Sequence, residues 1–408
     1  MKPRRHADLP LHHGRVPKWL AKRMSILGGA IMEAIVVEYG KEEVFRRLSD
    51  PFWFQSLGCV LGMDWHSSGI TTSVMGALKT AINPRSKELG IYICGGRGKH
   101  SRQTPSELLA IADQTGLDGN HLVRCSKLSA KVDNTAIQDG FQLYLHSFIL
   151  SSSGEWAVVQ QGMDQSTRMA RRYHWHSTDF ESFIEEPHTS VYGQNKGQIL
   201  NLTHKKANPT REGLLEVTRE APKRILPEIA KLVMPRHHEV KSANLNLKRL
   251  GSVLALAHET GPSNFESLLL LQGVGPRTIQ SLTLVSEVIY GTPSRFSDPA
   301  RFSFAHGGKD GHPFPVPTKV YDQTIDHLNN AINRAKIGLT DKTKALKKLH
   351  SLSVKLEESF IPNNNFDRII AREKAKSHLY GGRTVKGFVG PTKNTKQQKN
   401  KGQQLVLF

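Results

Sequence analysis

Two strand-like segments decide the fold, FQLYLHSFIL at residues 141–150 and EWAVVQQ at residues 155–161. Both are rich in aromatic and β-branched residues, and the polar turn at residues 151–154 (SSSG) separates them. Such a pair of segments, joined by a short turn that contains glycine, is typical of an antiparallel β-hairpin. Because helical patterns precede the hairpin along the chain, we expect an α+β domain at residues 1–205.

The spacing of apolar residues predicts helices around this hairpin and through most of the rest of the chain. Before the hairpin, helices are expected at residues 17–39, from residue 51, at 70–82 and at 104–115, with a short strand at 89–94. An all-α domain should occupy residues 206–317 and an antiparallel helix pair residues 318–365. Residues 366–408 are rich in lysine and poor in apolar residues, which predicts a disordered basic tail.

The charge balance of the 408-residue chain favours a polyanionic partner. Its 56 Lys and Arg residues against 36 Asp and Glu residues give a net charge of +20, and nucleic acid is the commonest partner of such a protein. The three cysteines never occur in CxxC spacing, which argues against a disulfide framework and against a thiolate-rich zinc site. No apolar stretch reaches the length of a membrane span. We therefore expect a cytoplasmic, nucleoid-associated protein without a membrane partner.

The most specific motif is LQGVGPRT at residues 271–278, which lies between two helical patterns. Glycines let a backbone approach a phosphate closely, and the first N–H groups of the following helix can bind it. The motif resembles the helix-hairpin-helix of DNA repair proteins, although an ordinary corner between two helices is the alternative. The residues expected to bind DNA are Gly273, Val274, Gly275, Pro276, Arg277 and Thr278.

The helices around this motif also resemble the helix-hairpin-helix glycosylase superfamily. The resemblance implies a catalytic lysine where Arg277 stands here, and a catalytic aspartate near the position of Arg295. An arginine cannot form a Schiff base, because its guanidinium is delocalised and always charged. The resemblance therefore extends to DNA binding and not to glycosylase chemistry.

A second basic segment, GGRGKHS at residues 95–101, follows the strand expected at 89–94. Together with Arg102 it forms a glycine-rich basic cluster that lacks the spacing of a Walker A loop. Arg97, Lys99 and Arg102 are predicted to contact phosphates, and a solvated loop without a ligand is the alternative.

Acidic and histidine residues of the first domain suggest a site for phosphodiester hydrolysis. Asp64, His66, Asp133 and Asp139 are the candidate catalytic residues, and Asp64 and Asp139 are the candidate ligands of Mg²⁺ or Mn²⁺. Carboxylate oxygens suit such ions, which activate water and stabilise the charge on phosphorus. The alternative is that Asp64 caps a helix and Asp139 lies in a turn. Alanine at either metal ligand should leave folding intact.

His174 and His176 belong to the basic run RRYHWH at residues 171–176. Their alternate spacing could place both rings on one side of a strand, where they could bind a metal. Contact with phosphate or packing in the interior is the more common role of such residues.

The last five residues, Gln404, Leu405, Val406, Leu407 and Phe408, resemble the pentapeptide by which bacterial repair and replication proteins bind the polymerase sliding clamp. In such recognition Gln404 forms hydrogen bonds while Leu405, Leu407 and Phe408 fill an apolar groove. The alternative is an apolar end without a partner.

Several segments together resemble one uncharacterised prokaryotic family, domain of unknown function 763. They are LPLHHGRVPKWL, GMDWHSSGITT, KVDNTAIQDGFQLY, WAVVQQGM, ARRYHWH, MPRHHEV and FSFAHGGKDGHPFPV. The resemblance extends over about residues 7–328 and implies a shared fold without an activity.

These observations lead to three hypotheses of function. The first is a DNA-binding protein of replication-coupled repair or recombination that cleaves structured DNA as a divalent-metal-dependent nuclease. The second is a non-enzymatic protein that binds DNA junctions or structured nucleic acid and is recruited to the sliding clamp. The third is an enzyme that acts on RNA.

Overall fold

The computed structural model describes Leu9, Leu11 and residues 16–64, 67–179, 181–231, 247–300, 308–309, 312–313 and 318–358. His66, the segment 366–408 and, with it, Gln404, Leu405, Leu407 and Phe408 lie outside the described residues.

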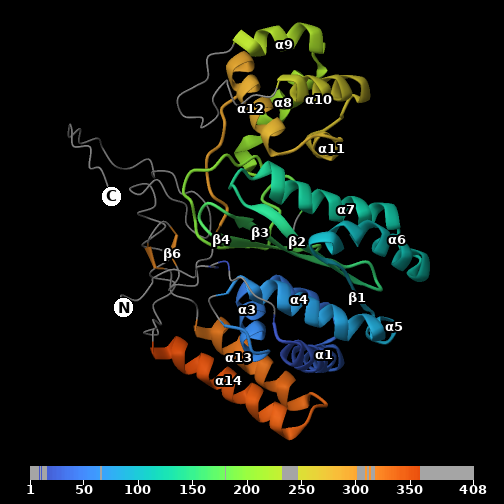
Figure 1. The fold of residues 1–408 in the computed structure, drawn as a ribbon, viewed down its shortest axis with the longest axis vertical. Helices are drawn as coiled ribbons and strands as arrows, with labels where there is room; N and C mark the ends of the chain where they lie inside the picture. The colour runs from blue at the N-terminus through green and yellow to red at the C-terminus, as the bar shows by residue number, and fades with distance from the viewer. Residues whose placement is uncertain are drawn as a thin grey trace, which may run out of the picture.

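A five-stranded antiparallel sheet forms the centre of the fold (Figure 1), and its strands lie side by side in chain order. They are β1 (Ile91–Arg97), β2 (Gln142–Ser151), β3 (Trp156–Asp164), β4 (Met169–His176) and β5 (Ser190–Tyr192). The expected hairpin is confirmed as β2 and β3, with Leu150 opposite Trp156. The strand expected at residues 89–94 forms as β1 and continues to Arg97. The α+β prediction is therefore confirmed.

Both faces of the sheet are buried, because successive side chains of a strand point to opposite sides. One row of register partners across four strands belongs to a single core: Cys94, Phe148, Val158 and Trp175. The residues beside them face the other core: Ile93, Ile149 and Ala157. A sheet buried on both faces needs a helical layer on each side.

The N-terminal helices cover the face of Ile93, Ile149 and Ala157 (Figure 1). They are α1 (Lys18–Tyr39), α2 (Lys41–Ser49), α3 (Pro51–Val60), α4 (Gly69–Ile82) and the short α5 (Ser86–Leu89). The expected antiparallel pair follows as α13 (Thr318–Arg334) and α14 (Leu339–Glu358). It packs on the outside of this layer, where Leu328, Ile332 and Leu349 join the same core.

The layer on the second face begins with α6 (Thr104–Thr115) and α7 (Gly119–Lys131). Five further helices lie beyond it (Figure 1): α8 (Asn208–Arg219), α9 (Pro222–Lys231), α10 (Leu247–Thr260), α11 (Phe265–Leu270) and α12 (Pro276–Tyr290). One core runs from Phe148 in the sheet to Phe265 and Leu282 in these helices. The helical segment is therefore packed continuously onto the sheet.

Short elements complete the described chain. They are the 3₁₀ turns η1 (Asn83–Arg85), η2 (Gly98–Gln103) and η4 (Lys205–Ala207), the π turn η3 (Val132–Ala136), and the ribbon of β6 (Gly308–Lys309) and β7 (His312–Pro313). After α12 the chain runs beside the segment that follows β5, where the Asn201 N–H donates to the Arg295 carbonyl at 2.8 Å. This path brings Asp298 to β4.

Candidate nucleic-acid interface

The motif at residues 271–278 forms a tight corner between α11 and α12. Gly273 has a φ of +82°, a backbone conformation that suits glycine. The Val274 side chain is buried in the core between the sheet and the helices, which anchors the turn to that core. Pro276 is the first residue of α12, where its lack of an N–H group costs no hydrogen bond.

Gly275 stands immediately before α12 in an extended conformation. No side chain caps the start of α12, and a Cβ built at Gly275 would meet nothing within 4 Å. The protein itself therefore does not require glycine at this position. A helix start without a cap has N–H groups available for an anion, and the absence of a side chain at Gly275 leaves room for one to approach.

Two side chains from outside the helical segment hold the corner in place. The Lys131 ammonium at the end of α7 donates to the Val274 carbonyl at 2.5 Å, and the Gln138 amide donates to the Pro276 carbonyl at 3.1 Å. Burial lowers the pKa of Lys131. On the same side of α7, Arg124 forms an ion pair with Glu266 of α11 at 2.6 Å. The segment KVDNTAIQ at residues 131–138 therefore fixes the corner relative to the sheet.

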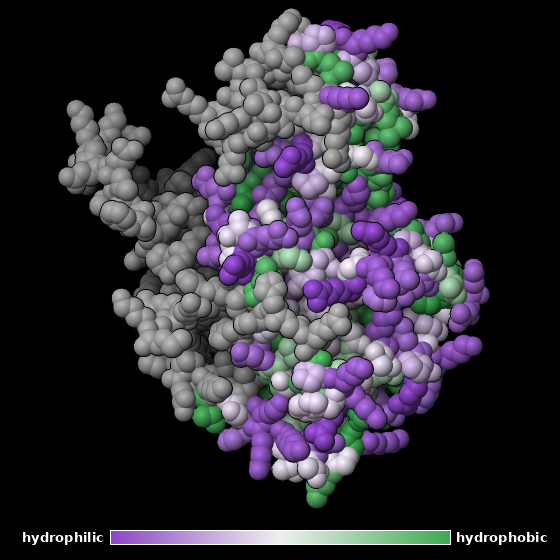
Figure 2. All heavy atoms as spheres, viewed as in Figure 1, coloured by the Kyte–Doolittle hydropathy of each residue, from purple (hydrophilic) through white to green (hydrophobic). Residues whose placement is uncertain are grey.

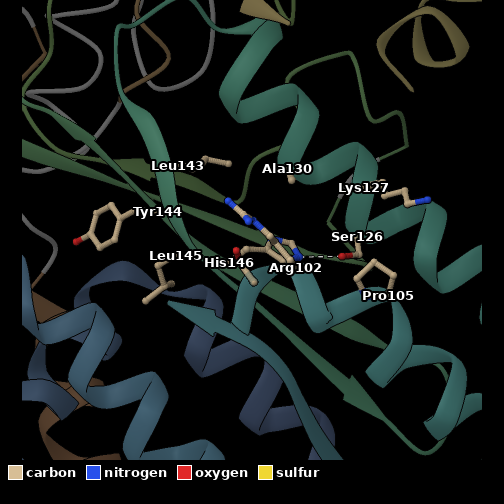
Figure 3. Close-up of a pocket in the computed structure, with 10 residues that line it drawn as sticks. Arg102, Pro105, Ser126, Lys127, Ala130, Leu143, Tyr144, Leu145 and His146 are labelled. Carbon is tan, nitrogen blue, oxygen red and sulfur yellow. Dashed lines mark hydrogen bonds between the residues drawn. The ribbon is translucent and has the colours of Figure 1, made fainter. Parts of the chain in front are cut away.

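The second basic segment also lies beside α7. A cavity of about 200 Å³ lies between η2, the start of α6, α7 and β2 (Figure 3). Arg102 and Lys127 are among its lining residues. Lys127 lies one helical turn before Lys131, so both project from one face of α7. The structure thus brings the two predicted groups of DNA-binding residues, the corner and Arg102, to one helix.

The other predicted basic residues surround this face. Arg97 ends β1 with its guanidinium 5.8 Å from the centre of the Tyr144 ring, and Lys99 is exposed on η2. Arg277 is exposed in the first turn of α12, whereas Thr278 is buried. Among the described residues on the side drawn in Figure 2, hydrophilic residues predominate and hydrophobic ones lie between them.

The candidate catalytic acids occupy different environments. Asp64 is exposed beyond the end of α3, whereas Asp133 and Asp139 are buried in the protein interior. Within the part of the chain that the structure describes, no three His, Cys, Asp or Glu side chains form a group that could hold a metal ion. The predicted Mg²⁺ or Mn²⁺ site at Asp64 and Asp139 gains no support from this placement and stays a prediction.

Asp133 lies in η3 and accepts hydrogen bonds from three side chains that sequence reasoning did not connect with it. Trp175 Nε1 and Gln160 Nε2 donate to Oδ2 at 3.0 and 2.6 Å, and His188 Nε2 contacts Oδ1. Burial raises the pKa of Asp133 despite these partners. Its oxygens are occupied by groups of the protein interior.

Asp139 is held in the same way by Arg171 and Tyr173 of β4. The Arg171 guanidinium donates to Asp139 at 2.9 Å and to Asp298 at 2.6 Å, while the Tyr173 hydroxyl donates to Asp139 at 2.6 Å. The two carboxylates raise the pKa of Arg171, so this fully buried guanidinium stays charged. The ion cluster fastens the segment after α12 to the sheet.

The basic run in β4 is structural. Arg172 is fully buried between the rings of Phe54 and Tyr192, 4.6 and 4.8 Å from their centres. It donates to His174 Nε2 at 2.8 Å, and burial keeps the pKa of His174 well below its ordinary value. His176 contacts Glu155 at 2.7 Å. Interior packing, one of the roles expected for these histidines, is the one observed.

Sequence reasoning also missed a hydrogen-bond chain at the cavity. His146 of β2 contacts Ser126 of α7 through Nε2 and Gln160 of β3 through Nδ1, each at 2.8 Å. The histidine is buried, and this burial lowers its pKa to about 4. The alternation of polar and apolar residues along β2 and β3 could have indicated that His146 and Gln160 share a face, since they are register partners.

The fold and this interface define an α+β protein in which an antiparallel sheet, covered by helices on both faces, supports a glycine-containing helix corner beside a basic helix. Among the described residues no helix is long and apolar enough to cross a membrane. The chain belongs to the family described as "Protein of unknown function (DUF763)", whose profile matches residues 5–316. No match was found among curated proteins or among solved structures.

Proposed function

We propose that the protein binds the phosphate backbone of DNA through the α11–α12 corner and the basic face of α7 and η2. One observation carries the proposal: a Cβ at Gly275 would meet open space, so the packing does not require glycine at this position before the uncapped start of α12. Lys131 of the basic helix α7 holds this corner in place. Glycine at such a position is explained by a ligand that must approach the backbone closely.

The charges next to the corner support the same ligand. Lys127 and Arg102 lie at the cavity on one side of α7, and Arg277 is exposed on the first turn of α12. Cations arranged along one face bind successive phosphates without reading the bases. Binding should therefore be independent of DNA sequence and sensitive to salt.

The substitution Gly275→Val tests the proposal, because the added side chain meets no protein atom and would meet a bound phosphate. The loss of charge-assisted hydrogen bonds to one phosphate corresponds to about 2 kcal/mol, or roughly a thirtyfold loss of affinity. Fluorescence anisotropy with a labelled duplex measures this change.

Gly338→Val is the matched control. Gly338 also precedes a helix, α14, and a Cβ there also meets nothing within 4 Å, but it lies in the layer on the opposite side of the sheet. Both variants should unfold at similar denaturant concentrations, and only Gly275→Val should lose affinity. Equal affinity of the two variants for DNA would show that the corner is only a structural turn.

We also propose that the C-terminal residues Gln404, Leu405, Leu407 and Phe408 recruit the protein to the polymerase sliding clamp. The support is the sequence QLVLF alone, at the end of a lysine-rich segment. Calorimetric titration of the clamp with the full chain, and with a chain ending at Gln403, should give micromolar binding only for the full chain. Equal binding by both chains would refute this partner.

The hypothesis of a metal-dependent nuclease is not part of this proposal. Asp133 and Asp139 accept hydrogen bonds from buried side chains of the protein. Asp64 is exposed beyond the end of α3. The arrangement of residues at the corner favours the binding of structured DNA, which the second hypothesis describes.

A further inference from the structure

Four side chains from separate elements form a continuous hydrogen-bond chain that ends at the cavity. Ser126 Oγ of α7 is 2.8 Å from His146 Nε2, and His146 Nδ1 is 2.8 Å from Gln160 Oε1. Gln160 Nε2 is in turn 2.6 Å from Asp133 Oδ2. Ser126 and His146 are among the residues that line the cavity, and Figure 3 shows them joined beside Arg102.

The direction of each hydrogen bond in the chain follows from Asp133. Its Oδ2 accepts one hydrogen bond from the Trp175 indole and a second from the NH₂ group of the Gln160 amide. The Gln160 carbonyl then faces His146 and accepts from Nδ1–H. This leaves a lone pair on Nε2, and the Ser126 hydroxyl therefore donates its proton to His146.

The environment of the serine oxygen distinguishes it from a buried structural hydroxyl. Its proton is directed at a base, so it presents lone pairs to a cavity whose lining includes Arg102 and Lys127 and no acidic residue. A simple anion-binding pocket would present donors. A hydroxyl paired with a neutral imidazole beside two cations suits attack on an anionic electrophile.

We propose that Ser126 is the nucleophile of a phosphoryl-transfer site that takes a phosphodiester of the nucleic-acid backbone. The choice of substrate rests on the proposed DNA binding. Ser126 is next to Lys127, which also lines the cavity and lies one helical turn before Lys131, the residue that holds the corner. A strand that follows this face of α7 from the corner would therefore pass the cavity.

The attack of Ser126 needs no reactant besides the phosphodiester. The Ser126 Oγ–phosphorus bond forms while its proton passes to His146 Nε2, and Arg102 and Lys127 offset the charge on the non-bridging oxygens. The bond from phosphorus to the leaving sugar oxygen breaks, and that oxygen takes the proton from His146. The products are a serine-linked phosphodiester and a strand with a free hydroxyl. To release the serine, the oxygen of a water molecule or of a nucleic-acid hydroxyl attacks phosphorus and gives its proton to His146. The Oγ–phosphorus bond then breaks, and Ser126 Oγ takes the proton from His146.

A phosphorylating reagent tests the serine independently of DNA. The full chain is treated with diisopropyl fluorophosphate, and the modified residue is identified by peptide mass spectrometry. We expect one rapid adduct on Ser126, lost in Ser126→Ala and slowed roughly a hundredfold in His146→Gln. Ser129→Ala is the matched control and should react as wild type, because Ser129 lies on the same buried helix face but donates to a backbone carbonyl at 3.0 Å. Absence of an adduct on Ser126 in a folded chain would overturn the proposal.

A second experiment connects the serine to DNA. Labelled DNA is incubated with the full chain, denatured in detergent and examined for a covalent complex, which Ser126→Ala should abolish. Gly275→Val should lose this complex and keep the reagent adduct. A reagent adduct on Ser126 together with no affinity for DNA would retain the nucleophile and refute the DNA-binding function. DNA binding without an adduct on Ser126 would retain the DNA-binding function and refute the nucleophile.

Discussion

Acidification should destabilise the protein through His146, and the structure sets the size of the effect. The ring is neutral in the folded chain because burial lowers its pKa to about 4, whereas an unfolded histidine has a pKa of about 6.5. Between these values the unfolded chain binds more protons, so a fall in pH favours unfolding. The stabilising contribution is therefore complete above about pH 6.5 and is lost as the pH falls toward 4.

The pKa difference amounts to about 3 kcal/mol in full, of which about 2 kcal/mol is lost between pH 7 and pH 5. The pKa of His174 is also lowered by burial, so it contributes with the same sign. Asp133 contributes with the opposite sign, because burial raises its pKa. A measurement on wild type alone would therefore combine several groups.

Urea unfolding of wild type and of His146→Gln at pH 7 and pH 5 isolates the histidine. Glutamine can still contact Ser126 but does not titrate, so His174 and Asp133 contribute to both proteins. Wild type should lose about 2 kcal/mol more free energy of unfolding than the variant between the two pH values. Equal losses would refute the conclusion that His146 is held neutral by its surroundings.

Two further predictions concern individual residues of the site. Asp139→Ala should lower the free energy of unfolding by about 3 kcal/mol, because it leaves a buried guanidinium with one partner fewer, whereas Asp64→Ala at an exposed position should change it by less than about 0.5 kcal/mol. Denaturant titration compares the two, and equal stability would contradict the assigned role of Asp139. Gly273→Ala should cost about 1 kcal/mol or more, because φ is +82° and the new Cβ would lie 3.2 Å from Val253. An unchanged thermal midpoint would show that the corner tolerates a side chain.

Local sequence patterns were sufficient for many elements of this fold, although α2, α7 and β5 were not among those expected. The hairpin of β2 and β3, the helices on both sides of it and the α13–α14 pair all follow from apolar spacing and turn residues over short stretches. The position of the α11–α12 corner was equally clear, because glycine and proline restrict the backbone at the residues where they occur.

The polar interior could not be predicted in this way. Asp133 and Asp139 were expected from the sequence to be catalytic residues, yet both bind to groups of the protein 27–55 residues away. Arg171 meets Asp298 across 127 residues. For the same reason we expected alanine at Asp139 to leave folding intact, and the buried ion cluster reverses that expectation. A charged residue in a sequence does not reveal whether a distant segment will neutralise it.

The salt dependence of DNA affinity tests the central claim most directly. Each phosphate neutralised by a cation adds about −0.9 to the slope of log K against log salt concentration for B-form DNA. Arg277 lies at the corner, and Arg102 and Lys127 lie at the cavity beside α7. Replacement of all three by glutamine should make the slope about 2.7 units less steep for every duplex sequence. The exposed Lys344 and Lys347 of α14 provide the control, and their replacement by glutamine should leave the slope unchanged. Equal slopes for wild type and the triple variant would contradict backbone binding at this face.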